Sequence, residues 1–168
     1  NKQYPAIDSR FLFANTGYNF RPTEMEGAIG TVQFNRFSSY FDKRTDLAEF
    51  YMEKFKEFSS FIETPIIKSN TKCAWFGYPV MLKENSSFHM KDLTNFLESH
   101  KIETRPVMSG DFTQHPVADL FDHKIVGDLK NTRYIHSNAF FIGIHAGITK
   151  SQREYVVSKF REFFSDYK

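Results

Sequence analysis

The sequence has little excess charge of either sign and no long apolar run. Its 22 basic residues outnumber its 20 acidic residues slightly, which gives a formal net charge of +2 at pH 7. This balance argues against a surface that coats nucleic acid and against an acidic tail. The chain also lacks the roughly 18 consecutive apolar residues that a membrane-spanning helix requires. We therefore expect neither nucleic acid nor a membrane among its partners.

Cysteine is almost absent. The single one, Cys73, cannot form an internal disulfide, which favours a reducing compartment, and we expect a cytoplasmic protein. Because Cys73 precedes an aromatic run, we expect a small apolar core residue rather than a nucleophile. The histidines are scattered over different predicted elements, so we expect no metal site. The chain begins with Asn1 without a leader pattern, and we expect it to be part of a longer protein.

Aromatic residues are plentiful, with 20 Phe, 8 Tyr and 1 Trp in 168 residues. They supply enough buried area for one core. The order of helical and strand patterns predicts an α/β chain, of the α+β kind, in two parts. Residues 1–62 form a lead-in segment and a long helical region, and residues 63–168 form a small α/β domain.

The long helix is predicted from its first turn. Thr23 and Glu26 have the spacing of a capping box, and apolar residues then recur at helical spacing, which predicts one long or kinked helix over 23–62. The first turns contain small residues, Gly27 and Gly30 among them, that allow another element to approach closely. We expect this first part to pack against a second domain or subunit.

Three apolar segments, 74–82, 102–107 and 139–144, predict the strands of the small sheet. Pro79 in the first segment favours a sheet edge or a bulge. An amphipathic helix that ends near His100 separates the first two strands, which favours a crossover connection.

Two further helices are predicted. A short one contains Leu120, and the last one begins with a second capping box, made by Thr149 and Gln152. The predicted inward face of the last helix consists of Val156, Phe160, Phe163 and Phe164.

A polar turn runs directly into the long helix. It contains Tyr18, Asn19 and Arg21, and an amide next to a guanidinium can bind an anion such as a phosphate group. An ordinary structural turn accounts for the same residues, so both interpretations stay open from the spacing alone.

Residues 17–30 follow the pattern G-Y-N-x-R-x-T-E-x-x-x-A-I-G. This pattern resembles the DegT/DnrJ/StrS family of pyridoxal-phosphate-dependent enzymes, which act on nucleotide-linked keto sugars. The resemblance continues through 75–79, 102–106 and 141–149, and so covers nearly the whole chain. It implies the C-terminal part of such an enzyme. The implied fold is a long connecting helix followed by a small three-stranded sheet flanked by helices, as in the C-terminal domain of aspartate-aminotransferase-like enzymes.

The resemblance also implies a cofactor, pyridoxal 5'-phosphate, bound mainly by a domain that this sequence lacks. Asn19 matches the family asparagine that reaches the cofactor phosphate of a neighbouring subunit, which implies a homodimer. Tyr18 and Arg21 on the same turn are implied to line the entrance, although Arg21 suits a structural ion pair equally well. The Schiff-base lysine belongs to the absent domain, so we expect no catalytic residue here and no activity from this chain alone.

Two substrate-binding residues are implied for the nucleotide sugar. Arg105 could bind the diphosphate and His115 the sugar or nucleotide, although an exposed strand-end arginine and a turn histidine are equally ordinary. Transamination is the family default, in deoxysugar or polysaccharide biosynthesis. The stretch 75–78 and the loop over 109–116 resemble in part a dehydratase branch of the family, which often has Gly-Asn followed by Arg-Gln-Pro in the loop. Asp111, Gln114 and His115 depart from that pattern. A non-catalytic dimerisation or binding module is the third alternative.

Overall fold

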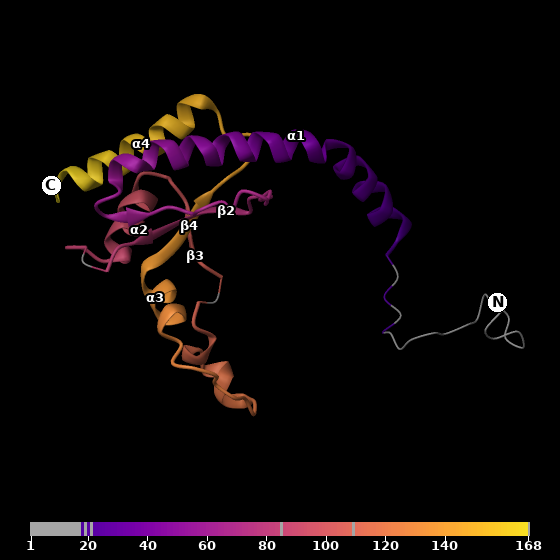
Figure 1. Cartoon of the computed structure of the whole chain (residues 1–168). Helices are drawn as coiled ribbons and strands as arrows, with labels where there is room; N and C mark the ends of the chain where they lie inside the picture. Colours follow the sequence, from indigo (N-terminus) through magenta and orange to yellow (C-terminus); the bar gives the residue numbers. More distant parts are fainter. Residues whose placement is uncertain (1–17, 19, 21, 85, 109, 168) are drawn as a thin grey trace, which may run out of the picture. The chain divides into compact units, whose positions relative to one another are not determined.

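A computed structural model describes residues 18, 20, 22–84, 86–108 and 110–167 (Figure 1). Asn19 and Arg21, both predicted to contact the cofactor, lie outside these residues. Contacts divide the chain into two compact units between Phe37 and Ser38, inside helix α1 (Glu24–Lys54), and each unit is described by itself. The sequence-based division at residue 62 stays a prediction.

The first unit contains the beginning of α1. The predicted capping box is confirmed, because the Thr23 backbone N–H donates to Glu26 Oε2 at 2.6 Å and the Glu26 N–H donates to Thr23 Oγ1 at 3.3 Å. Large apolar side chains of this first part of α1 are exposed within the unit. They are Met25, Ile29, Val32, Phe34 and Phe37.

The end of the predicted long helix is wrong. Helix α1 ends at Lys54, a 3₁₀ turn η2 (Phe55–Phe58) follows, and Ile62 begins the short strand β1 (Ile62–Glu63). Ile62 pairs with Leu82 across the sheet. The apolar residues after Lys54 that suggested a continuing helix are all buried in one core. A residue of a 3₁₀ turn or a strand can be buried there as well as a helical one, so their spacing did not show where the helix ends.

The second unit is built on a four-stranded antiparallel sheet with the order β1-β2-β4-β3. Strands β2 (Gly77–Leu82), β3 (Thr104–Pro106) and β4 (Ala139–Gly143) occupy the three predicted segments, and β1 is the strand that the prediction missed. Strands β2 and β3 are both antiparallel to β4 and therefore run parallel to each other. Helix α2 (Met90–Ser99) lies in their crossover connection, as predicted, but β4 separates the two strands.

Pro79 lies in a strand that has neighbours on both sides. Strand β1 pairs with β2 only at Met81 and Leu82, whereas Pro79 pairs with Phe141 of β4. On the side of β2 that faces β1, Pro79 has no partner among the described strand pairs. A proline, which lacks the backbone N–H, is therefore tolerated there. The expected edge position is confirmed locally, although β2 as a whole is an inner strand.

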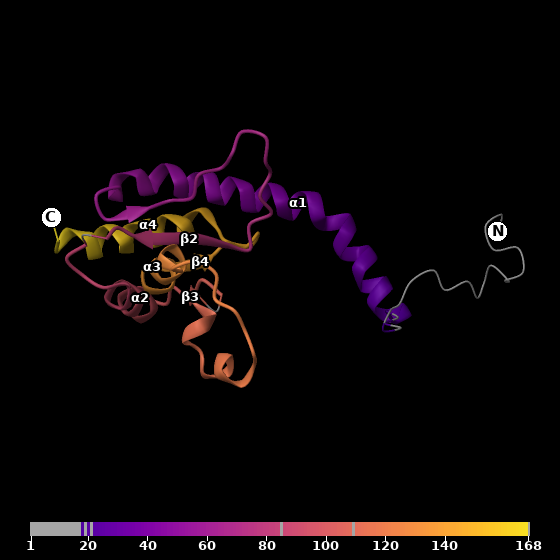
Figure 2. The ribbon, with the colours of Figure 1, turned by 60° about the horizontal axis from the view of Figure 1, so that its bottom comes forward.

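One face of the sheet carries the core. Tyr78, Val80 and Leu82 of β2 are buried on it, under the second half of α1 and helix α4 (Lys150–Ser165), which lie side by side in Figures 1 and 2. The predicted capping box of α4 is confirmed. Its inward face includes Val157, which the prediction omitted, whereas Val156 is only half-buried.

The opposite face is partly covered by helix α3 (Lys130–Asn138), which contacts β2 and β4. Its Tyr134 hydroxyl donates to the Leu82 carbonyl at 2.7 Å. Figure 2 shows the long excursion between β3 and α3, which contains the 3₁₀ turns η3 (Phe112–Gln114) and η4 (Pro116–Leu120). The predicted helix around Leu120 is thus a 3₁₀ turn.

Two further findings concern the predictions made for the cysteine and for membrane spans. Cys73 is exposed, so the expected core position is wrong; it lies in the irregular stretch before β2, where Trp75 is the residue that turns inward. No helix in the described part of the chain is long and apolar enough to cross a membrane.

Candidate functional site

The register of the sheet builds the candidate site. Phe141 of β4 pairs with Pro79 of β2 on one side and with Arg105 of β3 on the other. Directly paired residues point to the same face, and these three alternate with the buried residues of the core face. The pairing therefore brings an arginine and an aromatic ring together on the face that the α1 and α4 helices leave uncovered.

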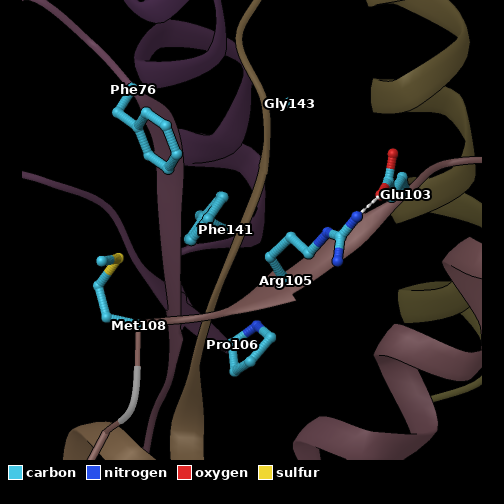
Figure 3. A pocket seen from close by; sticks show the side chains of 7 residues that line it. All are labelled: Phe76, Glu103, Arg105, Pro106, Met108, Phe141 and Gly143. Carbon is cyan, nitrogen blue, oxygen red and sulfur yellow. Dashed lines mark hydrogen bonds and ion pairs between the residues drawn. The ribbon is translucent and has the colours of Figure 1, made fainter.

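A groove of about 620 Å³ opens at this position (Figure 3). Its apolar walls are aromatic, because Phe76 and Phe141 meet edge to face with ring centroids 5.6 Å apart. Phe76 is 76% exposed, a large apolar side chain facing solvent immediately before β2. The described lining residues are Phe76, Glu103, Arg105, Pro106, Met108, Phe141 and Gly143.

The polar wall of the groove is an ion pair. The Arg105 guanidinium hydrogen-bonds to the Glu103 carboxylate, and both side chains are largely exposed. A guanidinium presents several donors in a planar fork, so Arg105 can keep one contact to Glu103 while other donors bind a phosphate oxygen. The arrangement suits a ligand with an apolar or aromatic part and an adjacent anion.

Gly77 gives the Phe141 ring its place in the groove. A Cβ at Gly77 would lie 2.3 Å from Phe141 Cδ2, and Gly77 pairs with a second glycine, Gly143. The aromatic ring therefore packs directly over the β2 backbone, which only a residue without a side chain permits.

Asp111 organises the excursion after β3. Its side chain is fully buried and accepts hydrogen bonds from the Thr113 backbone N–H at 3.1 Å, from Thr113 Oγ1 at 2.6 Å and from Gln114 Nε2 at 3.1 Å. Arg133 Nε of α3 lies 3.5 Å from Asp111 Oδ2. Hydrogen bonds to the charged form, from Thr113 first and then Gln114, lower the pKa of Asp111 from 3.8 to about 2.

This shift predicts an acid-sensitive contribution to stability. Because the folded-state pKa is below the unfolded value, Asp111 stabilises the fold fully above pH 4, and this contribution is lost as the pH falls from about 4 towards 2. Denaturant unfolding measured over this range should therefore show a shallower loss of stability for Asp111→Asn than for the wild-type chain. Parallel curves for the two proteins would contradict the assignment.

The structure separates the predicted site residues. Arg105 lines the groove, whereas His115 does not occur among the described lining residues and stacks on Phe112 with ring centroids 5.5 Å apart. In the first unit Tyr18 is 88% exposed and stacks on Phe20. Of the three residues predicted to contact the cofactor the structure describes Tyr18, and a side chain this exposed does not by itself enclose pyridoxal phosphate.

Several residues of the groove escaped sequence reasoning. Phe76 and Phe141 lie in aromatic and apolar runs that indicate core, and Met108 lies in a loop. The available signal was the alternation of inward and outward side chains in the residues that lead into β2, where Trp75 is buried and Phe76 is exposed. Asp111 gave no signal, because an isolated Asp in a polar loop is ordinary in sequence.

Residues 3–161 match the DegT/DnrJ/EryC1/StrS aminotransferase family. The chain belongs to this family. The match spans almost the whole sequence, including the segments of β2, β3 and β4 that build the groove, and it confirms the resemblance based on sequence motifs. Those motifs indicated the C-terminal part of a family enzyme.

The chain resembles individual family members over most of its length. It is 33% identical to the lipopolysaccharide biosynthesis protein RfbH of Salmonella typhimurium, with 94% of this chain and 36% of RfbH aligned. It is also 33% identical to the GDP-4-keto-6-deoxy-D-mannose 3-dehydratase of Yersinia pseudotuberculosis, over 86% of this chain and 36% of that enzyme. By comparison, identity to the dTDP-4-amino-4,6-dideoxy-D-glucose transaminase of Shigella dysenteriae is 26%.

A solved structure confirms the fold. The Escherichia coli GDP-4-keto-6-deoxy-D-mannose-3-dehydratase with bound hydrated pyridoxal phosphate superimposes with a TM-score of 0.77 at 30% identity, over 89% of this chain and 38% of that one. The chain thus spans little more than a third of the length of the relatives that it matches.

Proposed function

We propose that this chain is the C-terminal part of a pyridoxal-phosphate-dependent enzyme that acts on a nucleotide-linked keto-deoxysugar and removes a sugar hydroxyl. The observation that carries the reaction type is the identity to sugar 3-dehydratases, which is 27%, 32% and 33% for three of them, against 26% to a transaminase. The partial likeness of the 109–116 loop to the dehydratase branch supports the same choice. Transamination is the second candidate, favoured by the family that matches.

The groove is the proposed contact with the nucleotide sugar. Arg105 supplies a guanidinium for the diphosphate, and the rings of Phe76 and Phe141 supply an apolar wall for the base or sugar. His115 remains a proposed contact outside the groove. A fixed guanidinium orients the substrate by its phosphates and leaves the sugar free to reach groups that lie elsewhere in the complete enzyme.

The cofactor is proposed to be held mainly by protein outside this chain. Pyridoxal phosphate supplies an electron sink for bond cleavage next to the substrate carbonyl. Asn19, Tyr18 and Arg21 are the proposed contribution of this chain, across the interface of a cytoplasmic homodimer. The exposed apolar side chains at the start of α1, such as Ile29 and Phe34, support an interface there. On this proposal the chain alone is inactive.

The reaction type is tested with the complete enzyme, expressed from the coding sequence that contains this chain. The enzyme is incubated with pyridoxal phosphate, glutamate and one of two substrates, GDP-4-keto-6-deoxy-D-mannose or dTDP-4-keto-6-deoxy-D-glucose. The products are analysed by mass spectrometry. Loss of a hydroxyl oxygen supports dehydration, whereas replacement of the keto oxygen by an amine establishes the second candidate. If the cofactor-loaded enzyme forms neither product, both reactions are contradicted for these two substrates.

Arg105→Gln in the complete enzyme is expected to raise KM for the nucleotide sugar about tenfold to a hundredfold. This is the range that corresponds to the loss of one charge-assisted hydrogen bond. Arg161→Gln is the matched control, because Arg161 binds Glu57 at 2.6 Å on the helical side of the domain. Steady-state kinetics should leave KM of the control unchanged, and an unchanged KM for Arg105→Gln would remove this residue from the substrate site.

A further inference from the structure

A buried carboxylate joins the excursion after β3 to helix α3. Asp111 is fully buried and faces Arg133 of α3, with 3.5 Å between Oδ2 and Nε. The Asp111 backbone N–H donates to Nδ1 of His136, one turn further along α3, at 3.1 Å. Both the side chain and the backbone of one residue are thus held by the same helix.

The backbone next to Asp111 is fitted closely to α3. Gly110 has a φ of +60°, and a Cβ at this position would lie 2.2 Å from His136 Nδ1. The Gly110 N–H also donates to the Val107 carbonyl at 3.0 Å, which closes a turn containing Met108. Met108 itself has a φ of +48°, a conformation that costs free energy for a side chain and needs support from its surroundings.

These contacts connect two walls of the groove. Met108 forms one wall and belongs to the turn that ends at Gly110, the residue before Asp111. Phe141 forms another wall, on β4, which begins at the residue after α3 ends. The Asp111 contacts to Arg133 and His136 therefore cross-link the segment that carries Met108 to the segment that carries Phe141. Asp111 itself does not occur among the described lining residues, so any influence on a ligand is indirect.

We propose that Asp111, held by Arg133 and His136, is a positioning residue that sets the distance between Met108 and Phe141 and thereby the affinity of the groove for the nucleotide sugar. The link to the substrate rests on the proposed function, whereas the positioning of Met108 does not. Packed elements tied at one point adopt one arrangement, and removing the tie lets the turn move relative to α3.

The positioning of Met108 is tested by NMR on the 168-residue chain labelled in its methionine methyl groups. The chain has five methionines, and Met108→Leu identifies the resonance of interest. In Asp111→Asn we expect the Met108 methyl to shift and broaden while the other four stay in place. Asp46→Asn is the matched control, because it removes another Asp–Arg pair, 2.8 Å to Arg153, on the helical side of the domain.

Variants of Arg133, the ion-pair partner of Asp111, keep the test decisive if Asp111→Asn does not fold. Arg133 is 59% exposed, so Arg133→Gln can be made with little loss of packing, and it should move the Met108 resonance in the same direction. Arg133→Lys keeps the cation and should restore most of the wild-type position. A Met108 resonance that stays fixed in Arg133→Gln, and in any folded Asp111→Asn, would overturn the proposal.

The consequence for the substrate is measured in the complete enzyme. Arg133→Gln is expected to raise KM about tenfold and to change kcat less than about twofold, because the groove and not the reacting atoms is altered. A purely structural role would lower stability with KM unchanged, and that outcome overturns the link to affinity. Absence of turnover in the wild-type enzyme would count against the proposed function only, since the Met108 resonance still decides whether Asp111 positions the turn.

Discussion

Phe160→Ala is expected to lower the free energy of unfolding of the chain by about 3 to 5 kcal/mol. Phe160 is fully buried at the centre of the aromatic core, and its ring centroid lies 4.6 Å from that of Phe55, 6.2 Å from that of Phe58 and 6.1 Å from that of Phe164. These neighbours come from two packed elements, α4 and η2, so the cavity left by the ring can close only if these elements shift towards each other and give up other contacts. The loss is a large part of the roughly 5 to 15 kcal/mol that stabilises a domain.

The measurement is denaturant unfolding followed by near-ultraviolet circular dichroism, which reports on aromatic packing. Phe121→Ala is the matched control, because it deletes the same ring from a side chain that is 66% exposed. It should change stability by less than about 1 kcal/mol. Equal effects of the two substitutions would show that Phe160 does not lie in the core described here.

Gly110→Ala is expected to lower the free energy of unfolding by about 2 to 4 kcal/mol. The positive φ of +60° costs a side-chain-bearing residue about 1 kcal/mol or more, and the overlap of the new Cβ with the His136 ring adds the cost of moving a ring that is hydrogen-bonded to Asp111. The turn next to Met108 should shift as a result, so the substitution should also perturb the groove.

The control separates these two contributions. Gly127 has a φ of +79°, but a Cβ there would meet nothing within 4 Å. Gly127→Ala should therefore cost only the conformational part, about 1 kcal/mol, and leave the Met108 methyl resonance in place. Thermal and denaturant unfolding of both variants checks the difference, and identical losses would contradict the close contact between Gly110 and His136.

The helix beginnings were predictable from sequence because their physics is local. A capping box needs two side chains three residues apart, and both predicted boxes, at Thr23 and at Thr149, form the expected hydrogen bonds. The three longer strands were predictable for a similar reason, since continuous apolar and aromatic segments have few alternatives in a small domain.

The errors occur where burial, not local spacing, decides the structure. Ile62 fits a helical pattern but pairs with Leu82, because η2 ends the helix and returns the chain to the sheet. Helix α3 has a polar sequence and was not predicted, since its anchor is tertiary, a hydrogen bond from Tyr134 to the carbonyl of Leu82. On α4 the prediction placed Val156 on the buried face, but its neighbour Val157 is the buried residue. The predicted face was therefore rotated by one residue about the helix axis.

By itself the sequence determined the family of this protein, the capped helices, the segments that become β2, β3 and β4, and Arg105 as a candidate ligand-binding residue. Those features depend on residues close together in the chain. Only the tertiary structure decided that Arg105 faces Phe141 and that Asp111 is buried between Arg133 and His136. Strand register and the docking of α3 set these contacts, and both arise from packing between residues that are more than twenty positions apart.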